Sequence, residues 1–238
     1  MNNKWLEQEL GVIAVELPGS GAVFEKLGLD YCVFGKLKLM EACAEHGILV
    51  EEVLGLLRDV PEPVGHNWLR ESSLSVMVDH ILQEFHEPAF RQIEILEDQM
   101  VAARTQFALS VPALSSLHQL LLHHLRGFRN HMLREEQQLF PLLCEIDPVA
   151  NPNVLPMRFG TLSAAMRTLE DDHGETERFL NSLSRVTNCF TAPSHTNGGL
   201  DALYGGLCDF ASDMRRHINF ENYILLPHVV RVEQMLLM

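Results

Sequence analysis

The stretch "HMLREEQQLFP" at residues 131–141 has a counterpart in "HINFENYILLP" at residues 217–227. In both, glutamate, leucine and proline follow the histidine at the fourth, eighth and tenth positions. Residues four apart on an α-helix lie on the same face, so each histidine and its glutamate can reach one point. The repeated pattern therefore predicts two helices that each carry an imidazole and a carboxylate towards a shared site.

The sequence around these two stretches is helical in pattern. From Ser72 onward apolar residues recur at steps of three and four, without the alternation typical of strands. The pattern is interrupted at residues 109–115, 147–156 and 191–199. Short connections between helices favour antiparallel neighbours. We therefore predict an all-α, up-down-up-down four-helix bundle over residues 72–238.

The first part of the chain has shorter elements. Residues 1–60 contain three helical pieces separated by glycine-containing turns, "GAVFEKLGL", "KLKLMEACAEHG" and "LVEEVLGLLRDV". The prolines and glycine of "PEPVGHNW" then interrupt the pattern. We expect a small helical N-terminal domain over residues 1–60 and a linker over residues 61–71.

Composition excludes several classes of protein. A formal net charge of -14 and a pI near 5.2 argue against a nucleic-acid surface and against an anionic membrane surface. No apolar run approaches a transmembrane helix, and the N-terminus lacks the features of a signal peptide. We therefore expect a cytoplasmic protein. Its five scattered cysteines predict reduced thiols, several of them buried, and not a disulfide framework.

Four histidines are each followed by glutamate four residues later, which is more than chance predicts. His80 and Glu84 share a polar stripe and are assigned to the surface, whereas His86 lies on the apolar side of the same helix. The inward histidines are regularly spaced: 131 - 86 = 45 and 217 - 173 = 44, while 173 - 86 = 87 and 217 - 131 = 86. This spacing indicates two consecutive helical hairpins related by a pseudo-twofold axis.

Buried imidazoles and carboxylates are costly unless they are neutralised or coordinated, and a metal does both. The candidate ligands are His86, His131, Glu135, His173, His217 and Glu221. Two glutamates can bridge two metals, which leaves two histidines to cap each. Imidazole and carboxylate donors favour iron, with zinc and manganese as open alternatives. The structural alternative is a set of core histidines that pair with buried acids.

Other polar residues on the inner faces receive weaker interpretations. His124 is assigned to the core or the edge of a cavity, and Glu177 is left out of the ligand set. Asp79 and Asp213 are either acceptors that hold imidazole tautomers or simply solvated acids.

Heptad spacing and the positions of the prolines predict which other residues near the ligands face inwards and where the helices are disturbed. The inward positions given by this spacing include Leu82, Leu142 and His228. Pro88 should disturb the first helix close to His86. Pro141 and Pro227 should bend or stop their helices beyond the site.

The segments "FHEPAFRQI", "HMLREEQQLFPLL", "EDDHGETE" and "HINFENYILLP" resemble the hemerythrin-like domain of the RIC family of iron-sulfur cluster repair proteins (YtfE, ScdA, DnrN and NorA types). The segment "VFEKLGLDYCVFGKLKLMEACAEHGI" resembles the N-terminal domain of that family. The resemblance implies two iron ions on the same six ligands, bridged by the two glutamates and by an oxo or hydroxo group. It also implies a role in nitrosative and oxidative stress, contact with nitric oxide or another diatomic ligand, and damaged iron-sulfur proteins as partners.

One departure from the family pattern affects the expected function. The family motif has two adjacent cysteines followed by glycines, whereas "DYCVFGK" has Cys32 followed by Val33 and Phe34. The resemblance therefore does not carry dithiol chemistry over to this domain, and Cys32 has either a single-thiol role or a structural one. The alternative function is a cytoplasmic nitric oxide buffer or sensor linked to denitrification, without repair activity. Catalytic turnover and assembly into a homo-oligomer are left open.

Overall fold

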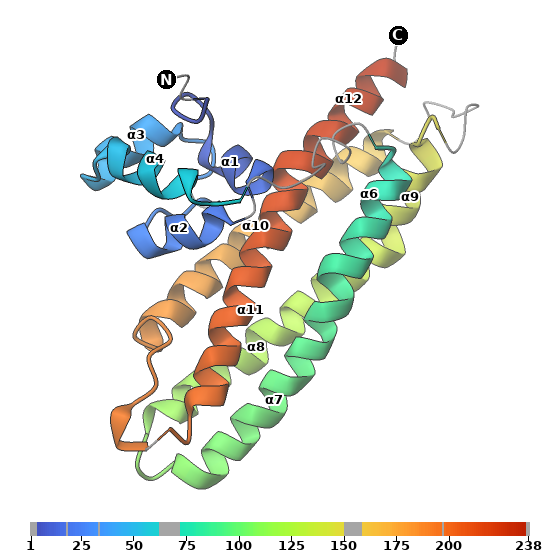
Figure 1. Cartoon of the computed structure of the whole chain (residues 1–238). Helices are drawn as coiled ribbons and strands as arrows, with labels where there is room; N and C mark the ends of the chain where they lie inside the picture. The colour runs from blue at the N-terminus through green and yellow to red at the C-terminus, as the bar shows by residue number, and fades with distance from the viewer. Residues whose placement is uncertain are drawn as a thin grey trace. The chain divides into compact units, whose positions relative to one another are not determined.

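The computed structural model describes residues 4–17, 19–32, 34–61, 72–149, 159–196 and 198–236. Within these ranges every regular element is helical, apart from an isolated antiparallel bridge between Glu9 and Lys38 (Figure 1). The predicted all-α fold class is therefore confirmed.

The chain forms two compact units. One contains Met1–Met77 together with Arg215–Met238, and the other contains Val78–Met214. The domain limits 1–60, 61–71 and 72–238 stay predictions, and residues 62–71 of the expected linker lie outside the described residues.

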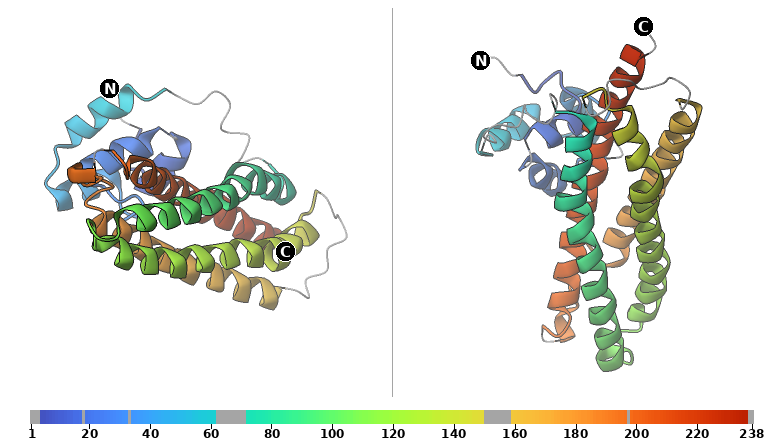
Figure 2. Two further views of the ribbon diagram at one scale, coloured as in Figure 1. Left: turned by 90° about the horizontal axis from the view of Figure 1, so that it is seen from below. Right: turned by 90° about the vertical axis from the view of Figure 1, so that its right-hand side faces the viewer.

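The Val78–Met214 unit is an antiparallel bundle. Its main helices are α7 (Glu87–Phe107), α8 (Ala113–Arg134), α10 (Phe159–Val186) and the larger part of α11 (Asp201–Phe220). Shorter elements are the π turns η1 (Leu82–His86) and η2 (Glu135–Leu139), helix α9 (Phe140–Ile146) and the 3-10 turn η4 (Ser194–Thr196). In Figure 1, α7 and α10 run downwards while α8 and α11 run upwards, and Figure 2 shows α7 and α8 side by side. This is the predicted up-down-up-down arrangement.

Apolar side chains fill the space between these helices. The buried cluster includes Ile93, Leu96 and Met100 of α7, Leu117, Leu121 and Leu125 of α8, Leu180 and Leu183 of α10, and Leu207, Phe210 and Met214 of α11. Burial of such side chains is the main force that holds the helices together. The bundle therefore gives a rigid frame for the polar side chains that interrupt the same faces.

Three π turns interrupt the helices, and each ends just before a proline. The backbone N–H of Glu87 donates to Leu82 O, that of Phe140 to Glu135 O, and that of Leu226 to Glu221 O. Pro88, Pro141 and Pro227 follow directly. Proline has no N–H, and its ring collides with the carbonyl four residues earlier, so the preceding turn widens. Pro141 and Pro227 therefore do not stop their helices, which continue as α9 and as α12 (Leu226–Leu236).

Each π turn also shifts which residues face inwards. A π turn holds one more residue than an α turn, so two turns across it take about eight residues instead of seven. Leu143, not Leu142, is accordingly buried after Glu135, and Val229, not His228, is buried after Glu221. Before η1 the same shift buries Ile81 in place of Leu82. The predictions that Leu82, Leu142 and His228 face inwards were wrong because the heptad count assumed an unbroken α-helix.

The other unit contains the short helices α1 (Leu10–Glu16), α2 (Ser20–Leu27), α3 (Leu39–His46) and α4 (Val50–Arg58), with η5 (Glu221–Leu225) and α12. Helix α6 (Leu74–Ile81) crosses the boundary between the units. The three predicted helical pieces correspond to α2, α3 and α4. The sequence missed α1, which is too short to show periodicity. Leu10 and Ile13 of α1 are nevertheless fully buried in this unit's own apolar cluster.

All five cysteines are free thiols, as predicted, although only Cys43 is buried. No helix in the described ranges combines the length and the apolar character needed to cross a bilayer.

Candidate metal centre

Four of the six predicted ligands lie in the Val78–Met214 unit and come together there. His86 ends η1, His131 lies in the last turn of α8, Glu135 begins η2, and His173 lies in the middle of α10. Between 1% and 3% of each residue's surface is exposed. Titratable groups this deeply buried are rare unless they are paired or coordinate a metal.

The carboxylate of Glu135 lies between two imidazoles. Its Oε2 is 3.3 Å from His86 Nε2, and its Oε1 is 3.3 Å from His131 Nε2. Each oxygen of one carboxylate therefore faces a different histidine. This is the arrangement that a carboxylate needs to share two cations, one on each oxygen.

His173 joins the same group from α10. One ligand atom from each of His131, Glu135 and His173 lies within 4.8 Å of the others. The rings of His131 and His173 have their centroids 5.3 Å apart and are inclined at 73°. Three side chains from two helices and a π turn can therefore hold one cation.

The remaining two predicted ligands form a pair of their own in the other unit. His217 Nε2 lies 3.2 Å from Glu221 Oε1, and both residues are fully buried. His217 lies in the last turn of α11, and Glu221 begins the π turn η5. This local geometry matches that of His131 and Glu135, as the repeated sequence pattern predicts.

Comparison with known families decides the identity of this helical region. The hemerythrin HHE cation-binding domain matches residues 77–229, which is more than half of the chain. The chain belongs to the hemerythrin family. A second match, to the ScdA N-terminal domain of unknown function, covers residues 6–60.

Curated relatives match almost the whole chain. The iron-sulfur cluster repair protein YtfE of Escherichia coli O17:K52:H18 (strain UMN026 / ExPEC) is 29% identical over 230 residues, which is 95% of this chain and 98% of the relative. The proteins of the same name from Citrobacter koseri and Shigella boydii serotype 4 are 28% and 29% identical over the same shares. An ScdA N-terminal domain ahead of a hemerythrin domain is the arrangement of the RIC family. The resemblance seen in the sequence is confirmed.

In this RIC protein the imidazoles of His86 and His131 each contact an acid through Nδ1, the ring nitrogen that does not face Glu135. His86 Nδ1 lies 2.8 Å from Glu136 Oε1, and His131 Nδ1 lies 3.2 Å from Asp172 Oδ2. An acid on Nδ1 favours the tautomer whose Nε2 is free to bind a metal. The hydrogen bond from His131 lowers the pKa of Asp172, and Arg134, which also donates to this carboxylate, lowers it further against the effect of burial. Burial raises the pKa of Glu136.

Sequence reasoning missed Glu136 and Asp172 because it searched for acids on the same helix as each histidine. Asp79 is exposed, and Asp213 accepts a hydrogen bond from Gln92 Nε2 at 3.4 Å. Asp79 lies seven residues before His86, which is about 10 Å along the helix axis and too far for direct contact. The observed acceptors instead come from neighbouring helices of the hemerythrin-like bundle. The available signal was a run of acids that includes or adjoins a candidate ligand, as at residues 135–136 and 170–172.

We expect Asp172→Ala to weaken metal binding in this RIC protein about 10- to 100-fold, because His131 loses the acceptor that orients its ring. Metal affinity by competition with a chelator measures the effect. Asp171→Ala, which removes the exposed neighbouring carboxylate, is the matched control and should bind like the wild type. Equal affinities in the two variants would show that Asp172 does not support the site.

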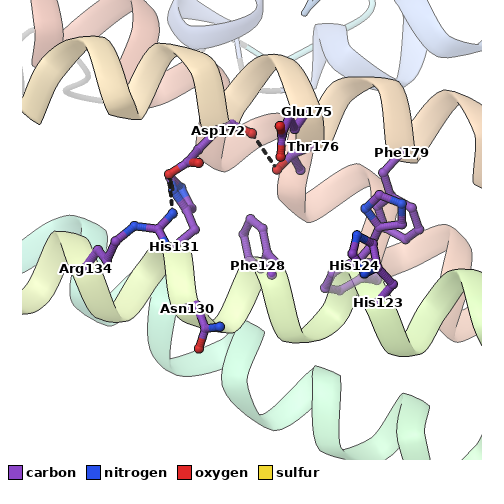
Figure 3. Close-up of a pocket in the computed structure, with 12 residues that line it drawn as sticks. His123, His124, Phe128, Asn130, His131, Arg134, Asp172, Glu175, Thr176 and Phe179 are labelled. Carbon is purple, nitrogen blue, oxygen red and sulfur yellow. Dashed lines mark hydrogen bonds and ion pairs between the residues drawn. The ribbon is translucent and has the colours of Figure 1, made fainter.

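A pocket of about 270 Å³ lies beside His131, between α8 and α10. Figure 3 shows His131, Arg134 and Asp172 at one end, with Phe128 in the middle and His124 and Phe179 at the other end. The rings of His124 and Phe179 stack with centroids 4.2 Å apart. His124 is thus at the edge of a cavity, one of the two places predicted for it. His131 is the member of the cluster that lines this pocket.

The remaining predictions concern residues outside the cluster. His80 is half-buried and lies edge-on to Phe85 at a centroid distance of 5.8 Å, so it is not a purely surface residue. Glu177 is half-buried and is not a member of the clusters of metal-ligand type found among the described residues.

Proposed function

We propose that this protein is a non-heme di-iron protein whose six ligands are His86, His131, Glu135, His173, His217 and Glu221. The observation that carries the proposal is Glu135, whose two oxygens face two different imidazoles. Imidazole and carboxylate donors without thiolate suit iron. Glu135 would bridge the two ions, with Glu221 as the second bridge.

Helix α11 supports including His217 and Glu221. Phe210 and Met214 lie on the inward face of this helix, within the bundle core. His217 follows Met214 by three residues and Glu221 by seven, so they continue the same face along an unbroken helix. The segment that packs the core therefore also carries the last two ligands.

We further propose that the protein restores damaged iron-sulfur clusters in cytoplasmic proteins under nitrosative and oxidative stress. Its relatives over 95% of the chain are named iron-sulfur cluster repair proteins. Bound iron would supply the metal that a damaged cluster has lost. The chain's own contribution is to hold that iron on buried imidazoles and carboxylates, with Glu136 and Asp172 fixing two of the rings.

Repair is tested by the recovery of a hydratase whose [4Fe-4S] cluster has been damaged with nitric oxide. Addition of the iron-loaded protein should restore the activity, while the Glu135→Leu variant treated with the same iron should not. An equal recovery with free iron alone, or none with a fully loaded sample, would contradict repair.

A second candidate is a nitric oxide buffer or sensor, and the pocket that reaches His131 favours contact with a diatomic gas. Titration of the reduced protein with nitric oxide separates the two functions. Tight stoichiometric uptake without recovery of the hydratase would favour the buffer. Recovery of the hydratase would favour repair.

A further inference from the structure

The segment that carries His217 and Glu221 also has a second face, which packs against the N-terminal helices. Arg215 and Asn219 each lie two residues before one of these ligands. Two residues correspond to a rotation of about 200° on an α-helix, so they point away from the ligand side. Both make contacts with the N-terminal part of the same compact unit. The N-terminal part of the chain therefore contacts the segment 215–221 on the side opposite His217 and Glu221.

Gly11 in α1 is the centre of these contacts. Its N–H donates to Gly35 O at 2.9 Å, and its C=O accepts a hydrogen bond from Asn219 Nδ2 at 2.8 Å. Asn219 is only 2% exposed. Because a buried hydrogen bond is expensive to break without replacement, this contact resists separation of α1 from the end of α11.

Tyr223, in the middle of η5, lies against the same two glycines. A Cβ atom added to Gly11 would overlap the Tyr223 ring, and one added to Gly35 would overlap the Tyr223 hydroxyl and the Tyr31 backbone carbonyl. Glycine is thus required at both positions by close approach. Gly55 in α4 differs, since a Cβ there would have no neighbour within 4 Å.

A second group of contacts lies one turn earlier. Arg215 Nη1 is 3.9 Å from Glu25 Oε1, and the thiol of Cys32 lies 3.6 Å from Arg215 O. Tyr31 OH donates to the same Glu25 oxygen at 3.4 Å. The N-terminal helices therefore contact this segment on both sides of His217 along the chain.

We propose that the N-terminal domain is a clamp for the metal ligands: Gly11 and Gly35 seat Tyr223 and Asn219, fix the π turn η5, and thereby hold Glu221 in its ligating position. When these contacts break, Glu221 is no longer fixed in position and the metal that it binds dissociates faster. Asn219 and Tyr223 are positioning residues, since they act through Glu221. The inference rests on the proposed role of His217 and Glu221 as iron ligands.

The test compares Gly11→Ala and Asn219→Leu with Gly55→Ala in the full-length protein. Alanine favours a helix over glycine by about 1 kcal/mol, so any general effect on the N-terminal helices appears in Gly55→Ala as well. Hydrogen exchange at the amides of residues 221–226 reports on η5 directly. We expect faster exchange there in the first two variants and wild-type exchange in Gly55→Ala.

The second readout is the rate at which a ferrous chelator removes iron. We expect about a tenfold rise in Gly11→Ala and in Asn219→Leu, as for loss of a partner that orients a ligand. Asn219→Leu keeps the side chain's size but removes its donor, which guards against the failure of one variant to fold. Exchange and release rates equal to those of Gly55→Ala would overturn the clamp. A wild-type protein without iron would refute the proposed function instead, and hydrogen exchange would still decide the clamp.

Discussion

Replacement of Glu135 by leucine is expected to reduce the iron content of the purified protein from two ions per chain to almost none. The carboxylate of Glu135 faces both His86 and His131, so in the proposed centre its removal would take one ligand from each ion. Iron analysis of the desalted protein measures the loss. Glu94→Leu is the control, because the Glu94 side chain is 68% exposed and lies outside the cluster.

The same substitution should not lower the stability of the metal-free protein. A buried carboxylate is costly without a cation, and an apolar residue of similar size removes that cost. We therefore expect metal-free Glu135→Leu to be at least as stable to urea as the metal-free wild type. A variant that keeps two irons, or that loses iron only because it unfolds, would contradict the role assigned to Glu135.

Phe210→Ala should cause the largest loss of stability among the substitutions considered, about 3–5 kcal/mol in the free energy of unfolding. Phe210 is 1% exposed, and its ring meets that of Phe128 edge-on, with centroids 6.0 Å apart at 85°. Truncation leaves a cavity where α8 faces α11. Urea unfolding of the metal-free protein measures the effect without a contribution from bound iron.

Leu109→Ala is the matched control for the core. Leu109 is 101% exposed, so its truncation should change the free energy of unfolding by less than about 0.5 kcal/mol. If Phe210→Ala were as mild as Leu109→Ala, the bundle core would not be packed as the structure shows.

The bundle and the clustering of the candidate ligands were accessible to sequence reasoning because both depend on helix periodicity. A histidine and a glutamate four residues apart share a face in any α-helix, and an apolar stripe shows which way that face points. His131 and Glu135 follow from this argument alone. His86 could be identified only with the help of the regular spacing of the inward histidines along the chain, since no glutamate follows it at the fourth position.

The register near the ligands could not be predicted in the same way. Proline can end a helix, kink it or widen one turn, and the sequence pattern does not distinguish these outcomes. The widened turn moves burial from Leu142 to Leu143 and leaves Glu135 at the first position of η2. The two halves of the chain also differ here, because His173 lies in the continuous helix α10 while His86 ends a π turn.

Contacts between separate elements were the least predictable part. Glu136 reaches His86 and Asp172 reaches His131 across helix interfaces, and no periodicity links those pairs. The contact between Gly11 and Tyr223 joins positions at opposite ends of the chain. Such pairs depend on how helices pack, which is a property of the folded molecule.

The central claim is that four histidines and two glutamates hold two irons in each chain. Iron analysis of the wild type beside His217→Ala tests it most directly, with His195→Ala as a control for an exposed histidine. The account predicts two irons per chain in the wild type and in His195→Ala, and at most one in His217→Ala. Two irons retained by His217→Ala would contradict it.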